Sequence, residues 1–98
     1  MSLPIIFHRA ARAEFDQAHA WYEKQRSGLG EEFSERVHEQ LSQIAALPES
    51  HQCVYKDIRR AVVRRFPYSI LYRIKPNQVR VIAVFHGRRD PAVWQARI

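Results

Sequence analysis

Two stretches in the first half of the chain have the hydrophobic spacing of amphipathic helices. Over residues 10–25 and again over residues 31–47, apolar side chains recur every three or four positions, and polar side chains fill the positions between them. The glycine-containing segment 27–30 interrupts the pattern, and Pro48 ends it. We therefore expect an antiparallel helical hairpin whose two apolar faces cover another apolar surface.

The remaining apolar segments have the spacing of β-strands. Residues 3–7 form a short run rich in isoleucine, and residues 58–66, 68–74 and 79–86 contain alternating apolar positions. A Pro-Asn turn separates the last two of these segments. Residues 49–55 are polar and are interpreted as an irregular connection. The strands are expected to form the sheet on which the hairpin lies.

Strict alternation along the last strand predicts two largely apolar faces. One face would carry Val79, Val81, Ala83 and Phe85, and the other would carry Arg80, Ile82, Val84 and His86. Such a strand suits a central position, covered by the helices on one side and by a partner on the other.

The end of the chain contains a helix-start signal. Asp90 suits an N-cap and Pro91 the first helical position, so a short helical turn over residues 92–96 is expected to carry Trp94. Together with the other elements, this predicts a single α+β domain over residues 1–98, with the order β-α-α-β-β-β. A helical hairpin would pack on a small antiparallel sheet, followed by the C-terminal turn. A chain of this length can bury about 60 to 65% of its unfolded surface, enough for a small core.

The charge of the chain narrows the classes of partner. The 16 Lys and Arg residues outnumber the 10 Asp and Glu residues, which gives a net charge of +6 and favours polyanions or acidic protein segments. No apolar run approaches the ~20 residues of a membrane-spanning helix, and no secretory leader pattern is present, so a cytoplasmic protein without a membrane partner is expected. The lone Cys53 is expected to be half-buried and inert. The histidines lack metal-ligand spacing, so no metal or cofactor is expected.

Arginine side chains gather in the second half of the chain, on the expected strands and in the segments that join them. Guanidinium groups pair with phosphate and carboxylate oxygens, which makes these residues candidates for contacts with a partner or target. The alternative is a solvated sheet face whose charges prevent edge-to-edge aggregation. Trp21 and Trp94 are interpreted as core or interface anchors. The candidate contact residues are Arg60, Arg64, Arg65, Arg73, Arg80, Arg88, Arg89 and Trp94.

His86 is the best-placed candidate for catalysis, because it ends a strand close to several arginines in the sequence. Metal-free RNA cleavage needs a base, an acid and cations, and His86, Tyr68 or Tyr72, and Arg65 could supply them. The alternative is a histidine at a strand end that is hydrogen-bonded to the turn that follows it.

In combination, the residues resemble the ParE branch of the RelE/ParE toxin superfamily. The resemblance spans nearly the whole chain. It is carried by Gly28-Leu29-Gly30, Phe33, Val37, Ile44, Pro48, Arg60, Arg65-Phe66-Pro67-Tyr68, Ile70, Tyr72, Val84, His86-Gly87-Arg88-Arg89-Asp90-Pro91 and Trp94.

This resemblance implies a toxin of a type II toxin-antitoxin module, of the kind associated with plasmid stabilisation and growth arrest. The implied partners are a cognate antitoxin, which would bind the toxin in a hetero-oligomer, and DNA gyrase as the target. The ribonuclease branch implies instead a ribosome-dependent mRNA endonuclease, with Lys56, Arg65, His86 and Tyr68 as its catalytic candidates. A non-catalytic nucleic-acid-binding module is the third alternative.

Overall fold

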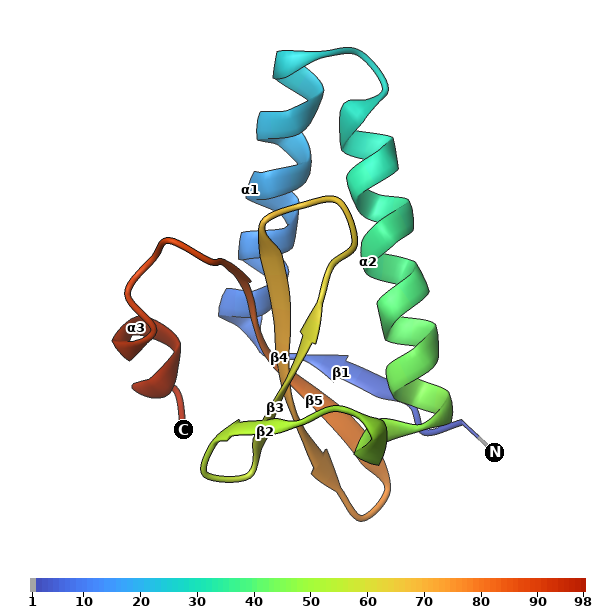
Figure 1. The fold of residues 1–98 in the computed structure, drawn as a ribbon, viewed down its shortest axis with the longest axis vertical. Helices are drawn as coiled ribbons and strands as arrows, with labels where there is room; N and C mark the ends of the chain where they lie inside the picture. Colours follow the sequence, from blue (N-terminus) through green and yellow to red (C-terminus); the bar gives the residue numbers. More distant parts are fainter. Residues whose placement is uncertain (1) are drawn as a thin grey trace.

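The computed structural model describes residues 2–98 and has the expected α+β architecture (Figure 1). One mixed sheet has the strand order β1-β5-β4-β3-β2, in which β1 runs parallel to β5 and all other neighbours are antiparallel. The elements are β1 (Ile5–Phe7), α1 (Arg9–Gln25), α2 (Leu29–Ala46), the 3-10 helix η1 (Pro48–Ser50), β2 (Cys53–Tyr55), β3 (Ile58–Val62), β4 (Tyr68–Lys75), β5 (Gln78–His86) and α3 (Ala92–Gln95).

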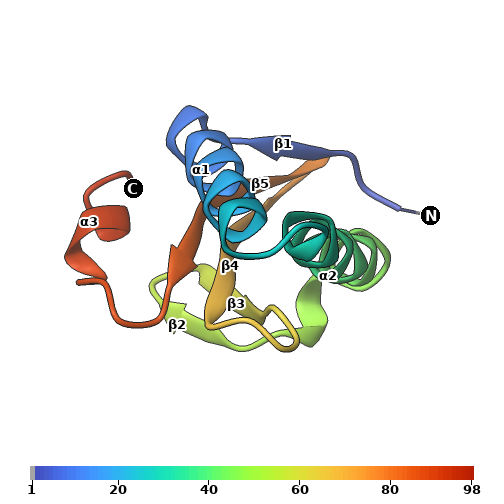
Figure 2. The same ribbon diagram turned by 90° about the horizontal axis from the view of Figure 1, so that it is seen from above.

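The sheet separates two apolar clusters. The α1–α2 hairpin covers one face, here called the helix side, and α3 lies against the opposite face, here called the far face (Figure 2). The larger cluster lies beneath the hairpin and is built around Phe33, Val37, Ile70 and Tyr72. The smaller cluster, on the far face, consists of Ile58, Leu71, Ile82, Ala83, Phe85 and Trp94. Residues of β4 and β5 therefore pack on both faces of the sheet, and the apolar pattern predicted this for β5.

A β-bulge changes the faces of β5 partway along the strand. Tyr72 pairs with Val81 whereas the preceding Leu71 pairs with Ala83, so Ile82 is an extra residue in the ladder. The strict alternation predicted for β5 is therefore wrong after Val81. Ala83 lies in the far-face cluster, and Val84 packs beneath the helices instead. One inserted residue moves every later side chain of the strand to the opposite face. When both faces are apolar, the alternating hydrophobic pattern does not reveal such an insertion.

Two other strand predictions also differ from the structure. The strand expected over residues 58–66, which is β3, ends at Val62. Arg65 in the following loop has a positive φ of 72°. The segment 49–55 is not wholly irregular, because it contains part of η1 and the edge strand β2, whose pairing with β3 is itself irregular. Cys53 is exposed rather than half-buried.

The loop of the helical hairpin is fastened by a carboxylate. Glu23 accepts hydrogen bonds from the backbone N–H groups of Gly28 (2.9 Å) and Gly30 (3.0 Å), and thereby satisfies free donors at the start of α2. Gly28 adopts the left-handed conformation, with φ 89°. At Gly30 the helices approach so closely that an added Cβ would lie 2.7 Å from the carbonyl oxygen of His19. These contacts fix the crossing of α1 and α2 above the sheet.

Candidate partner-binding groove

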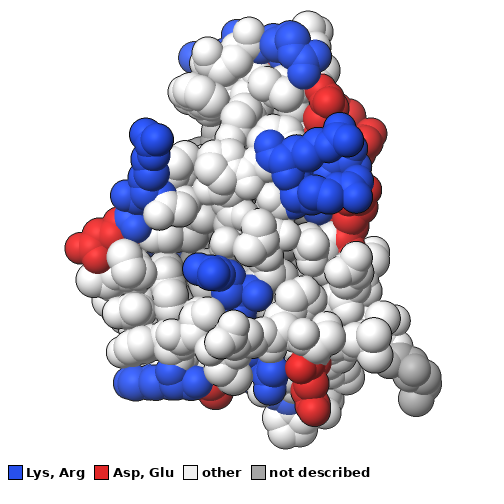
Figure 3. Space-filling model, viewed as in Figure 1, with Lys and Arg blue, Asp and Glu red and all other residues white. Residues whose placement is uncertain are grey.

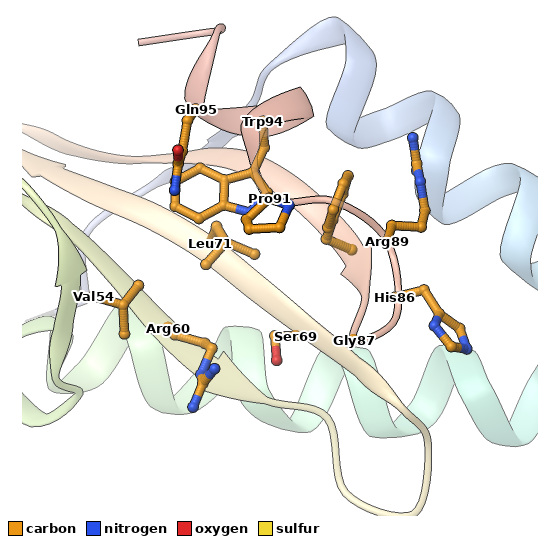
Figure 4. Close-up of a pocket in the computed structure, with 11 residues that line it drawn as sticks. Val54, Arg60, Ser69, Leu71, His86, Gly87, Arg89, Pro91, Trp94 and Gln95 are labelled. Atoms are coloured by element: carbon orange, nitrogen blue, oxygen red, sulfur yellow. The ribbon is translucent and has the colours of Figure 1, made fainter.

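A groove on the far face lies between α3 and the strands β2 to β5 (Figure 4). Its volume is about 270 Å³. In the close-up, Trp94 and Pro91 form one wall, Val54 and Arg60 face them from the other side, and Leu71 lies between the walls. The lining residues are Val54, Arg60, Ser69, Leu71, Phe85, His86, Gly87, Arg89, Pro91, Trp94 and Gln95.

The apolar residues that line the floor and one wall of the groove are well packed. Leu71, Phe85 and Trp94 are buried, and the Trp94 indole meets the ring of Tyr55 edge-on at 5.7 Å. Beside this floor the apolar surface continues into solvent, since Val54 is 42% exposed. An open apolar floor of this kind suits an apolar side chain from a partner.

Cationic groups stand at both ends of the groove. Arg60 projects from β3 and is exposed. At the other end, Arg89 stacks over the Phe85 ring at 4.3 Å, and its guanidinium donates to Oε2 of Glu14 at 3.2 Å. The groove therefore combines an apolar floor with guanidinium groups that can meet carboxylates or phosphates.

A buried ion pair holds the C-terminal segment against α1 and β5. Glu14 is 9% exposed and accepts two hydrogen bonds from Arg97, at 3.0 and 2.8 Å. Arg97 also donates to the backbone carbonyl of Ile82, and Glu14 accepts from the backbone N–H of Val84. Sequence reasoning missed this pair. The available signal was that Glu14 lies on the apolar stripe of α1, three residues after Ala11.

The predicted contact residues fall in several places rather than on one surface. Arg60, Arg89 and Trp94 meet at the groove. Arg73 is engaged by Asp57 in a bidentate pair at 3.0 and 2.8 Å, and Arg80 lies directly opposite Arg73 in the ladder. The others are Arg64, whose guanidinium lies 3.9 Å from Glu39, Arg65 in the β3–β4 loop and the exposed Arg88. Figure 3 shows Lys and Arg side chains in separate groups on the face that it displays.

Two of the four catalytic candidates come together. Tyr68 and His86 are directly opposed in β4 and β5, and their rings meet edge-on at 5.2 Å. Lys56 lies in the β2–β3 turn, with its Nζ over the ring of Tyr55, so the length of β3 separates it from that pair. Arg65 lies in the loop at the same end of the sheet as Tyr68 and His86. The structure thus assembles part of the set and leaves Lys56 apart.

The hydrogen bonding of His86 limits its chemistry. Its Nδ1 accepts from the backbone N–H of Arg88 at 3.0 Å, as the alternative interpretation of this histidine expected. In the neutral ring the proton then lies on Nε2, so the free nitrogen is a donor and not a base. Burial raises the pKa of the Tyr68 hydroxyl, which therefore also remains a donor at neutral pH. The pair is better suited to donating hydrogen bonds to a ligand than to removing a proton.

The other candidate groups of the described residues have structural roles. The buried Tyr72 donates from its hydroxyl to the carbonyl of Pro48 at 2.6 Å, away from His86.

Within residues 2–98, no three His, Cys, Asp or Glu side chains are gathered as metal ligands would be. None of the described helices has both the length and the apolar content needed to span a membrane.

Comparisons with known proteins give one family and one fold. A family model described as the ParE toxin of a type II toxin-antitoxin system, parDE, matches residues 5–91. Among solved structures, the chromosomal ParDE TA system from P. aeruginosa is similar, with a TM-score of 0.64 and 16% sequence identity. The match covers 87% of this chain and 96% of that one. At this identity the likeness concerns the fold alone. No curated protein matches the chain in sequence.

Proposed function

Because the chain belongs to the ParE toxin family of type II toxin-antitoxin systems, we propose that it inhibits DNA gyrase and is neutralised by a cognate antitoxin. The family match over residues 5–91 is the observation that carries this proposal, since it covers nearly all of the fold. Production of the chain without its antitoxin would then arrest growth. The toxin would act by binding gyrase rather than by catalysing a reaction of its own.

The groove on the far face is the proposed site for the antitoxin. Its apolar floor can receive an apolar side chain, and Arg60 and Arg89 can pair with carboxylates on the same segment. The net charge of +6 favours an acidic partner over a second copy of the chain. The similar solved structure is a ParDE toxin-antitoxin system, which supports an antitoxin as the partner.

The geometry of the polar residues supports gyrase inhibition over RNA cleavage. A nuclease of the predicted kind needs a base that can take a proton from a 2′-hydroxyl. The accepting Nδ1 of His86 is already bonded to the backbone of Arg88, and Lys56 lies beyond the length of β3. The paired rings of Tyr68 and His86 are the observation that favours the ribosome-dependent nuclease as the second candidate.

A supercoiling assay separates the two candidates. Purified chain should reduce supercoiling of relaxed plasmid by gyrase or trap double-strand breaks, and His86→Ala should keep at least part of this effect. In parallel, primer extension on cellular mRNA after induction should show no new codon-phased ends. Unaffected gyrase together with new mRNA ends that disappear in His86→Ala would replace the first candidate by the second.

A further inference from the structure

A second surface, on the helix side, carries aromatic rings that the fold leaves open to solvent. We call it the aromatic patch, and it consists of Trp21, Tyr22, Pro67, Tyr68 and His86. These residues line a hollow of about 400 Å³. A neighbouring hollow of about 220 Å³ shares Trp21, Tyr68 and His86 with it. The indole of Trp21 thus stands at the border of both hollows.

Of the two tryptophans interpreted as core or interface anchors, Trp94 lies in the core and Trp21 does not. The Trp21 side chain is 58% exposed, whereas Trp94 is 5% exposed. One edge-on contact to Tyr22, at 5.2 Å, supports the indole from its own helix. Exposing a large ring forfeits burial that it would gain in a core, and such rings are concentrated at binding surfaces. Trp21 therefore has the surroundings of a contact residue.

The rest of the patch is held in place by the core. Tyr22 packs edge-on against Phe66 at 4.9 Å and is tilted against Phe33 at 5.3 Å, both within the helix-side cluster. Tyr68 is fixed between Phe33 and His86, with ring distances of 5.2 Å to each. A ligand would consequently meet rings that need little ordering on binding.

Three cationic residues are close to the patch residues in the sequence. Lys24 follows Trp21 by three residues on α1 and so lies on the same side of the helix, and Arg88 follows His86 by two. Arg65 belongs to the same loop as Pro67. Among residues 2–98, none of these three cations forms an ion pair. The nearby carboxylate of Glu14 is already bound by two arginines.

We propose that the aromatic patch binds single-stranded nucleic acid, with unpaired bases stacked on Trp21 and in the two hollows beside it, and phosphates contacting Lys24, Arg65 and Arg88. Exposed rings interleaved with uncompensated cations are the combination that recognises unpaired strands. A base paired within a duplex is stacked on its neighbours and cannot reach the indole face. The Tyr68 hydroxyl and the Nε2–H of His86 offer donors to base edges.

The contacts favour a nucleic acid over an acidic peptide as the ligand. Carboxylates could meet the cations equally well, but a peptide would have to fill two hollows on either side of one indole with suitably spaced apolar side chains. Successive bases supply flat rings at regular spacing together with the phosphates. The inference goes beyond inhibition of gyrase, because it concerns a contact that the chain makes by itself.

The two tryptophans allow a direct binding experiment. A short oligothymidylate titrated into the purified chain should quench the fluorescence of the exposed Trp21. The affinity of this complex should fall steeply with added salt. Trp94→Phe should retain the quenching and Trp21→Phe should lose it. Trp21→Ala should lower the affinity, measured by anisotropy of a labelled oligonucleotide, by about tenfold. Because Trp21 is largely exposed, both Trp21 variants should keep the wild-type far-UV circular dichroism.

A matched pair of charge variants tests the location. Lys24→Ala should weaken oligonucleotide binding, whereas Lys75→Ala, in the last residue of β4 at the opposite end of the sheet, should not. Equal losses in both variants, absence of quenching, equal affinity for duplex DNA, or stronger quenching by an acidic peptide would each overturn the proposal. Gyrase inhibition is measured separately, so binding of oligonucleotide without inhibition refutes the proposed function and leaves this inference standing.

Discussion

At the scale of single residues, Glu14 is the one charged residue among residues 2–98 that is buried. Its two oxygens receive hydrogen bonds from Arg97, Arg89 and the backbone of Val84. A buried ion pair adds little over an apolar pair of the same shape, but removal of one partner leaves an uncompensated charge. Glu14 therefore matters because, without its carboxylate, the charge of Arg97 would be uncompensated.

Replacing Glu14 by Gln tests this dependence. The amide can still accept from Val84 but cannot neutralise Arg97, so we expect a loss of about 3 kcal/mol in the free energy of unfolding, measured by urea denaturation. Asp16→Asn is the matched control, because Asp16 forms an exposed pair with Arg12 on the same helix and should change stability by less than about 0.5 kcal/mol. Equal losses in the two variants would contradict the assigned role.

Glu23 predicts a dependence of stability on pH. Its pKa is lowered chiefly by the hydrogen bond from the Gly28 backbone. Because the folded pKa lies below the unfolded one, the stabilisation is complete above the usual glutamate pKa and is lost as pH falls through the lowered value. The stability difference between wild type and Glu23→Gln should therefore be largest near pH 7 and shrink in acid. A Glu23 carboxyl that titrates at an ordinary value by NMR would contradict this.

At the scale of elements, the hairpin depends on the close approach of its helices at Gly30. Alanine normally stabilises a helix relative to glycine, yet here its Cβ would meet the carbonyl of His19 at 2.7 Å and side-chain atoms of Glu23 at 3.0 and 3.1 Å. Gly30→Ala should destabilise the chain by about 1 to 3 kcal/mol in thermal or urea unfolding.

Gly28 provides the comparison for this prediction. An added Cβ there meets no atom within 4 Å, so only the left-handed backbone opposes substitution. Asparagine tolerates that conformation, and Gly28→Asn should therefore be milder than Gly30→Ala. An equally stable Gly30→Ala variant would show that the helices can separate without loss.

The elements differ in how far the sequence determines them. The helices α1 and α2 are predicted to within two residues of each end, because each has one apolar face and a clear break. The strand β5 is predicted in extent but not in the orientation of its second half. Its two faces are both apolar, so the extra residue Ile82 leaves no trace in the hydrophobic pattern. The edge strand β2 has only three residues, too few to be recognised in the sequence, and its pairing with β3 defines it.

The candidate sites, like the strands, could be predicted from the sequence only in part. Arginine composition indicates Arg60 and Arg89 as contact residues, but only the folded sheet and α3 bring them to one groove with Trp94. The Glu14–Arg97 pair joins residues 83 positions apart, a separation that local patterns cannot bridge. The exposure of Trp21 is also determined by the tertiary structure, because its position on α1 beside Tyr22 is compatible with burial and with exposure.

At the scale of the whole molecule, two surfaces lie on opposite faces of one sheet and meet at the end of β5. The groove on the far face combines an apolar floor with guanidinium groups, and the aromatic patch lies on the helix side. His86 borders both. A partner in the groove would therefore come next to a ligand on the patch at this residue.

Antitoxin affinity should depend on charge at the groove and not on charge in general. Arg60→Glu should weaken binding of the product of an adjacent antitoxin reading frame by about tenfold or more in calorimetry, since it places a carboxylate where one is to be bound. Arg80→Glu makes the same change outside the groove, opposite Arg73, and should have a smaller effect. Similar losses in both variants would argue that only net charge matters.

The most direct test is a gyrase supercoiling assay in which the antitoxin is titrated against a fixed amount of the chain. The chain alone should inhibit supercoiling, and antitoxin should restore it sharply when the two proteins reach their binding stoichiometry. Supercoiling that the chain leaves unchanged at concentrations well above those of gyrase would contradict the proposed function, as would inhibition that saturating antitoxin fails to relieve.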